Sequence, residues 1–216
     1  MNAAVTPAKR SATVASICVV ALVAGLGGFM ARKSAPFQKL DLTKAPVQCS
    51  SAYEPSLADQ AFDGRHADPA DIFRNRWAAG TTSGNINEWI AVDLGKDMEI
   101  STITFDWELA HPKDFTIRTR TDAEGFVADP KQWKEQARVK GLQERSFAAV
   151  NKHRDDTVID FVNRVVRPAE WMKLDRAEIP SARLVARHVM VHVTGLGRNN
   201  DTVVSIYEIE IAARPR

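Results

Sequence analysis

Three aspartates in one short segment could bind a hard metal ion. Asp63, Asp68 and Asp71 lie within nine residues, and Gly64 and Pro69 interrupt the segment. Calcium prefers carboxylate and carbonyl oxygens, and a loop that turns at glycine and proline could wrap around such an ion. The residues also allow a second interpretation, in which the loop is solvated and Asp63 caps a turn.

A second group of side chains suits a sugar. Trp107 could supply a stacking face, and Glu108 a carboxylate that accepts hydrogen bonds from hydroxyl groups. Trp107 could instead be a core residue at the end of a strand. The loop at residues 195–201 is polar and rich in glycine, as binding loops are. It carries three candidate ligand-binding side chains, Arg198, Asn199 and Asn200.

The histidines do not suggest a metal site, and no enzymatic motif is present. His188 and His192 share one face of a predicted strand, but four residues along a strand span about 13 Å, too far for one ion. The chain lacks G-x-S-x-G, Walker, G-x-G-x-x-G and H-E-x-x-H motifs. Two cysteines are too few for a disulfide scaffold or an all-cysteine zinc site. We therefore expect a protein that is not an enzyme.

Charge and composition exclude several further classes. Of 216 residues 44% are hydrophobic, which excludes wholesale disorder, collagen and coiled coil. Residues 1–33 hold four basic and no acidic side chains, whereas the remaining residues hold 25 basic and 27 acidic ones. A nearly neutral body argues against nucleic acid as a partner.

The basic N-terminal part contains a predicted membrane anchor. Residues 11–31 are uncharged and, as a helix, would span about 31 Å, the thickness of a bilayer core. A cleaved signal peptide is the alternative, but the end of this stretch offers no good small-residue cleavage site. We expect a short tail at 1–10, a transmembrane anchor at 11–31, a linker at 32–48 and one domain at 49–216.

The body is mostly of strand pattern. Apolar residues alternate in 89–94 and 99–107, and further candidate strands are 114–120, 145–150, 157–163, 187–193 and 203–211. Helical pattern is confined to short pieces near 56–62 and 130–139. Many short strands with little helix predict an all-β sandwich or barrel.

The order of local motifs resembles the discoidin, or coagulation-factor C-type, superfamily, whose bacterial branch is the family 32 carbohydrate-binding modules. The resemblance covers residues 49–212 and rests on the segments AFDG (61–64), RWA (76–78), EWIAVDLGK (88–96), WELA (107–110), KDFTI (113–117), ARHVMV (186–191) and SIYEIE (205–210). It implies an eight-stranded jelly-roll β-sandwich with the chain ends close together and ligand loops at one end.

The resemblance also implies site residues. Relatives often hold structural calcium with an aspartate in the A-x-D-G turn and a glutamate on the last strand, here Asp63 and Glu208. Galactose-binding relatives place a histidine where this chain has Ala78, and an arginine near the position of His111. Both departures weaken a galactose interpretation, and His111 remains a candidate ligand-binding residue.

A membrane anchor joined to a discoidin-like domain suggests two functions. The first is a membrane-anchored, non-catalytic module that binds a carbohydrate or another envelope component. The second is an accessory subunit of a membrane complex, using the sandwich for protein contacts. The positive-inside rule alone would keep the body in the cytoplasm. The resemblance favours an extracytoplasmic, periplasmic or extracellular, body, and we adopt that expectation.

The segment at 130–180 is longer than the family normally needs. Its apolar residues include Val158, Ile159, Phe161, Val162, Val165 and Trp171. These side chains must be buried, either by extending the sandwich or by covering a partner.

Overall fold

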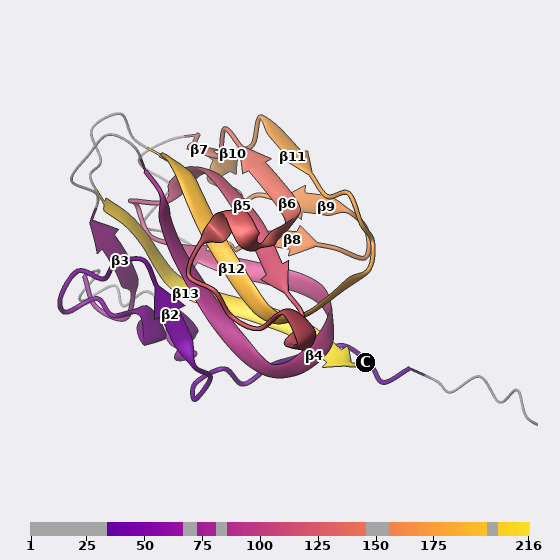
Figure 1. Cartoon of the computed structure of the whole chain (residues 1–216). Helices are drawn as coiled ribbons and strands as arrows, with labels where there is room; N and C mark the ends of the chain where they lie inside the picture. The colour runs from indigo at the N-terminus through magenta and orange to yellow at the C-terminus, as the bar shows by residue number, and fades with distance from the viewer. Residues whose placement is uncertain (1–33, 67–72, 81–85, 146–155, 198–202) are drawn as a thin grey trace, which may run out of the picture. The chain divides into compact units, whose positions relative to one another are not determined.

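The structure is a computed structural model, and it describes residues 34–66, 73–80, 86–145, 156–197 and 203–216. The predicted anchor at 11–31 lies outside these ranges. Within them, no helix is both long and apolar enough to cross a membrane. A compact unit covers residues 35–216 (Figure 1).

This unit is built almost entirely of strands, which confirms the predicted all-β class. Its strands are β1 (Gln38–Lys39), β2 (Val47–Cys49), β3 (Trp77–Gly80), β4 (Glu88–Trp107), β5 (Pro112–Arg120), β6 (Lys134–Lys140), β7 (Gln143–Glu144), β8 (Thr157–Asp160), β9 (Val165–Arg167), β10 (Met172–Lys173), β11 (Arg176–Glu178), β12 (Leu184–Leu196) and β13 (Val203–Pro215). Within the described residues there are also three short 3₁₀ helices, η1 (Ala58–Phe62), η2 (Asp122–Glu124) and η3 (Pro130–Gln132).

The long strand β4 connects two layers. Its first half pairs with β2 and β12, and β12 continues through β5 and β6 to β11. Its second half pairs with β13 and β8, while β13 also carries β1 and β3. The sequence predicted two strands here, 89–94 and 99–107. Gly95, between them, has a positive φ of 80°, but β4 continues past it into the second layer.

Along the strands, every second side chain points inward and fills the core between the two layers. Ile90 and Val92 point inward, as their period of two predicts, and pack with Ile103 and Phe105 from the second half of β4. Trp89 and Ala91 face the other way and join a separate small cluster outside the sandwich.

Several predicted boundaries need correction. The linker predicted at 32–48 is too long, because β1 pairs with β13 and β2 with β4, so the sandwich begins before residue 39. The helical pattern at 130–139 is mostly wrong, since β6 pairs with both β5 and β11 there. The expected eight strands become thirteen because the described chain contains several strands of two to four residues.

The long segment at 130–180 extends the sandwich. Ile159, Phe161 and Trp171 are buried in the main core, whereas Val162 and Val165 on the β8–β9 hairpin are exposed. The predicted strand at 145–150 lies mostly outside the described residues.

Candidate functional site

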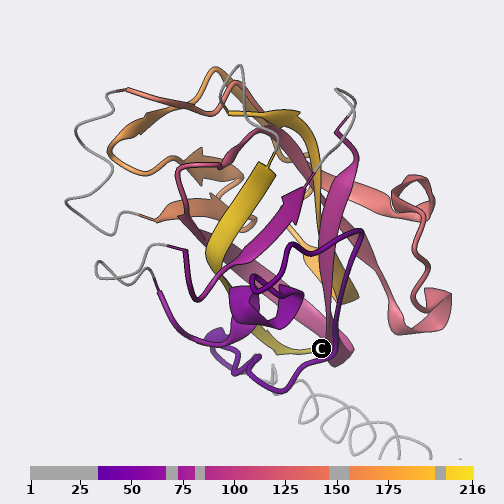
Figure 2. The same cartoon turned by 90° about the vertical axis from the view of Figure 1, so that its left-hand side faces the viewer.

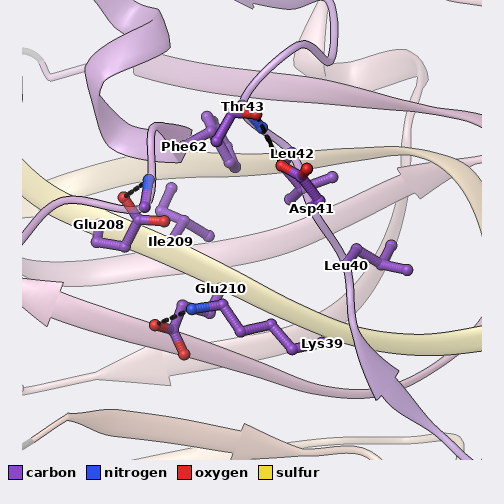
Figure 3. A pocket seen from close by; sticks show the side chains of 10 residues that line it. Lys39, Leu40, Asp41, Leu42, Thr43, Phe62, Glu208, Ile209 and Glu210 are labelled. Atoms are coloured by element: carbon purple, nitrogen blue, oxygen red, sulfur yellow. Dashed lines mark hydrogen bonds and ion pairs between the residues drawn. The ribbon is translucent and has the colours of Figure 1, made fainter.

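A pocket of about 300 Å³ lies between the segment Lys39–Thr43 and the last strand, β13. Its walls come from Lys39–Thr43 on one side and Glu208–Glu210 of β13 on the other, with Phe62 and Gly64 between them (Figure 3). Leu40, Leu42 and Ile209 make part of the lining apolar, while the carboxyl groups belong to Asp41, Glu208 and Glu210.

Glu208 is the most buried of these acids. Its residue is only 3% exposed, and one carboxylate oxygen accepts a hydrogen bond from the Gly64 backbone N–H at 3.1 Å. The pKa of Glu208 is raised to about 8, mainly by burial; the Asp63 and Glu210 carboxylates also act to raise it, whereas the Gly64 N–H and Lys39 act to lower it. The two residues predicted for calcium, Asp63 and Glu208, therefore lie close enough to interact.

Asp63 and Glu208 could each offer a carboxylate oxygen to a hard cation. Two oxygen ligands from carboxylates suit calcium, and a cation would stabilise the charged form of a buried carboxylate such as Glu208. Asp63 also accepts a hydrogen bond from the Arg65 N–H at 2.8 Å, as the turn-capping interpretation expects. Asp68 and Asp71 lie outside the described residues, and the described part of the chain holds no cluster of three or more metal-ligating side chains.

Beside this pocket runs a network of contacts between basic and acidic side chains that the sequence did not reveal. His66 contacts Asp106 at 2.9 Å through Nδ1 and Glu210 at 3.5 Å through Nε2. Lys39 contacts the same Glu210 at 2.6 Å. The network ties β1 and the loop after η1 to β4 and β13.

Trp107 does not offer a stacking face. It is only 4% exposed, its ring stacks on Phe105 at 4.6 Å between centroids, and Phe115 packs against it edge-on at 5.4 Å. The expectation of a sugar-stacking ring is corrected on this point, because Trp107 is a core residue at a strand end.

Glu108 and His111 are also buried among protein groups. The Glu108 carboxylate pairs with Arg76 at 3.2 Å and accepts a hydrogen bond from the Ala110 N–H at 2.7 Å. His111 is 1% exposed, and its carbonyl accepts a hydrogen bond from the Gly197 N–H at 3.1 Å. Arg198, Asn199 and Asn200 lie outside the described residues, so the candidate loop itself is not described beyond Gly197.

The exposed aromatic side chains lie elsewhere. Tyr53 and Phe73 are 65% and 63% exposed, and Leu57 is 40% exposed. We call these three residues the aromatic edge. For Tyr53 and Phe73, the only sequence signal was an aromatic residue in a segment without strand or helix periodicity.

The aromatic edge flanks strand β3. The Tyr53 N–H donates to the Ala78 carbonyl at 2.7 Å, and the Ala78 N–H donates to Ser56 at 3.3 Å, so the segment before η1 runs along β3. Phe73 lies four residues before β3, and the Arg76 guanidinium carbon lies 5.1 Å from its ring centroid. Arg76 thus contacts an exposed ring and a buried carboxylate at once.

Comparison with known proteins agrees with this fold. Residues 60–158 match the F5/F8 type C family model described as a NedA-like, galactose-binding domain. No curated protein sequence matches the chain.

Several solved structures are similar. CBM32-3 from a family 31 glycoside hydrolase of Clostridium perfringens is 16% identical, with a TM-score of 0.50 over 82% of this chain and 95% of its own. Chitosan-binding module 1 from the chitosanase/glucanase of Paenibacillus sp. IK-5 is 19% identical, with a TM-score of 0.48 over 81% and 98%. The family 32 module of C. perfringens NanJ, solved with galactose, is 12% identical, with a TM-score of 0.46 over 82% and 99%. Residues 60–158 are therefore similar to the F5/F8 type C, galactose-binding domain model, and the chain shares the all-β sandwich fold of CBM32-3.

Proposed function

We propose that the protein is a non-catalytic carbohydrate-binding module whose ligand contacts the aromatic edge. The observation that carries this proposal is the high exposure of Tyr53 and Phe73 beside one strand. Soluble proteins bury most of their large apolar side chains, so two exposed rings in segments beside the same strand favour a binding surface. Aromatic rings can cover the apolar face of a sugar ring, and the Arg76 guanidinium next to Phe73 can donate to its hydroxyl groups.

The family supports the same class of ligand. The matching family model describes a galactose-binding domain, and CBM32-3 of the clostridial glycoside hydrolase belongs to a class of carbohydrate-binding modules. Ala78 stands where galactose-binding relatives place a histidine, so this proposal names a carbohydrate without restricting it to galactose.

A glycan array tests the function and the surface separately. The full chain in mild detergent would be applied to immobilised galactosides, chitosan, pectin and alginate oligosaccharides. We expect binding to at least one class, and Tyr53→Ala with Phe73→Ala should weaken it about tenfold or more, as loss of central aromatic contacts does. Val162→Ala is the control, because Val162 is 49% exposed but lies on the β8–β9 hairpin. A chain that binds none of these carbohydrates would contradict the function, and unchanged binding by the double variant would contradict the surface.

The proposal includes a membrane anchor and a structural calcium ion. Residues 11–31 would hold the protein in the membrane with the sandwich on the extracytoplasmic side. Asp63 and Glu208 would hold calcium, which would neutralise a buried carboxylate and crosslink the loop after η1 to β13. Both features stand as predictions.

An accessory role in a membrane complex is the second candidate. Its supporting observation is the β8–β9 hairpin, where Val162 and Val165 are 49% and 37% exposed. If protein contact is the function, Val162→Asp with Val165→Asp should release partners that copurify with the full chain in mild detergent. Copurification unaffected by these changes would count against this candidate.

A further inference from the structure

A segment of residues 121–133 crosses the outer face of the layer formed by β4, β12 and β5; we call it the strap. Figure 2 shows it standing outside the sheet, at the right-hand edge of the view. Phe126 and Val127, with Trp133, pack on Trp89 and Met190 to form a small apolar cluster separate from the main core. The strap therefore covers an aromatic and apolar surface on the outside of the sandwich.

Side chains, rather than strand pairing, hold most of the strap. Arg120 of β5 donates to the carbonyls of Gly125 at 2.5 Å and Gln132 at 2.8 Å, and to that of Glu124. Arg118 of the same strand donates to the Pro130 carbonyl at 2.9 Å. The strap forms no ladder with β12 beneath it, so it can leave the surface without breaking the sheet.

His188 of β12 lies directly against the strap. It is 5% exposed, and its ring centroid lies 6.0 Å from that of Phe126 and 6.3 Å from that of Trp133. Its Nδ1 has no hydrogen-bond partner within the described residues. The Asp93 carboxylate lies 3.8 Å from this Nδ1, and it accepts a bidentate pair of hydrogen bonds from Arg187 at 2.8 and 2.9 Å.

Charges from every neighbouring element act on this imidazole. Asp93 of β4 and Asp122 of the strap favour its protonation, whereas Arg120 of β5 and Arg187 of β12 oppose it. Burial is the largest effect and, with the two arginines, leaves the pKa of His188 below its ordinary value.

We infer that the strap is an acid-sensitive cover, which protonation of His188 releases from the outer face so that Trp89 and Met190 become exposed. An imidazolium there would place a charge among apolar rings, next to the Arg120 guanidinium that holds the strap carbonyls. In the released state, water surrounds the imidazole and its pKa returns to about 6.5.

The direction of the pH effect follows from these two states. A histidine whose pKa is lower under the strap than in the released state favours the covered form at pH above about 6.5. Below that pH the released state binds a proton more readily. Each unit of difference in the pKa between the two states increases the released population about tenfold once the pH lies below both values.

Hydrogen exchange of the full chain tests the inference. We expect the protection factors of strap amides, corrected for intrinsic exchange, to fall between pH 7.5 and 5.5, while those of β5 stay unchanged. His188→Gln, which cannot titrate, should abolish this pH dependence. His192→Gln is the matched control, because His192 is buried on the same strand with a lowered pKa but contacts Asn87 rather than the strap rings. Strap protection that does not respond to pH in the natural chain, or a response that persists in His188→Gln, would overturn the inference.

A reciprocal measurement covers the case in which His188→Gln fails to fold. Phe126→Ala loosens the strap without changing a charge, so an NMR titration should find the pKa of His188 closer to 6.5 in that variant than in the natural chain. An identical pKa in both proteins would show that the strap and His188 are not coupled.

Discussion

The Gly64 backbone N–H donates a hydrogen bond to the Glu208 carboxylate at 3.1 Å, although 144 residues separate them in the chain. This contact joins the turn after η1 to the last strand of the sandwich. It also places a buried acid beside Asp63, whose charge favours the protonated form of Glu208. The effect of Glu208 on the stability of the protein can be measured in two ways, by adding calcium and by varying the pH.

Calcium should stabilise the protein if Asp63 and Glu208 hold it. A ligand that binds only the folded state at 100 times its Kd adds about 2.7 kcal/mol to the free energy of unfolding. For a domain of this size, the Tm should rise by several degrees in millimolar calcium relative to EGTA. Asp63→Ala or Glu208→Gln should remove the difference, and Glu178→Gln, an exposed acid on β11, should keep it. Superimposable melting curves for protein shown to be metal-free at the start would contradict the calcium prediction.

Without calcium, the stability should fall as the pH rises from 7.0 to 8.5. The pKa of Glu208 is raised from 4.5 to about 8 in the folded protein, so the folded state holds an extra proton between these values. Its contribution is complete below pH 4.5 and is lost as the pH passes 8. The pKa values of His188 and His192 are lowered from 6.5, so these histidines change the stability only below that pH and not between pH 7.0 and 8.5. Urea unfolding in EGTA should show that the free energy of unfolding declines over this pH range in the natural chain and not in Glu208→Gln. An equal decline in both proteins would mean that another group causes it.

Loss of the Arg76–Glu108 ion pair should destabilise the fold strongly. The two side chains are 13% and 6% exposed, and breaking a buried pair leaves one charge without compensation. Glu108→Ala should therefore lower the free energy of unfolding by about 3–5 kcal/mol in denaturant titrations. Glu178→Ala is the matched control, since Glu178 and its partner Arg176 are 50% and 72% exposed and such pairs contribute about 0–1 kcal/mol. Similar losses in the two variants would contradict this account of Arg76.

The sequence predicted the all-β fold because apolar residues occupy every second position in the strands that face the core. Ile90 and Val92 in one half of β4, and Ile103 and Phe105 in the other, carry that signal locally. The two residues of β1 are too few to show any period, so the sequence assigned them to a linker. The helical pattern in 130–139 failed because Ala137 and Val139 face the core in a strand paired with β5, and that tertiary contact overrides local preference.

The candidate site was harder to predict, because burial there depends on residues distant in sequence. The Trp107 ring is covered by Phe105 and also by Phe115. The residues next to Trp107 in the sequence do not specify its contact with Phe115. Glu108 finds its partner Arg76 32 residues away, across two strands. The family resemblance supplied Glu208, which no local pattern links to Asp63.

Membrane fractionation tests the predicted anchor. If residues 11–31 span the bilayer, the full chain should stay in the membrane pellet through a carbonate wash, and a chain that begins at residue 34 should be released. A reporter fused after Arg216 should be active only on the extracytoplasmic side. A mature protein that begins near residue 32 would instead establish a cleaved signal peptide, and activity of a cytoplasmic reporter would reverse the orientation.

The central claim, that carbohydrate contacts the aromatic edge, can be tested most directly by mapping the contact. Backbone amide shifts would be recorded by NMR during titration with the carbohydrate that binds most strongly on the array. We predict that the largest shifts fall in residues 51–57 and 73–79, with little change in the strap or around the Glu208 pocket. Saturable shifts confined to the strap or to the Glu208 pocket, with the amides of Tyr53 and Phe73 unmoved, would contradict the claim.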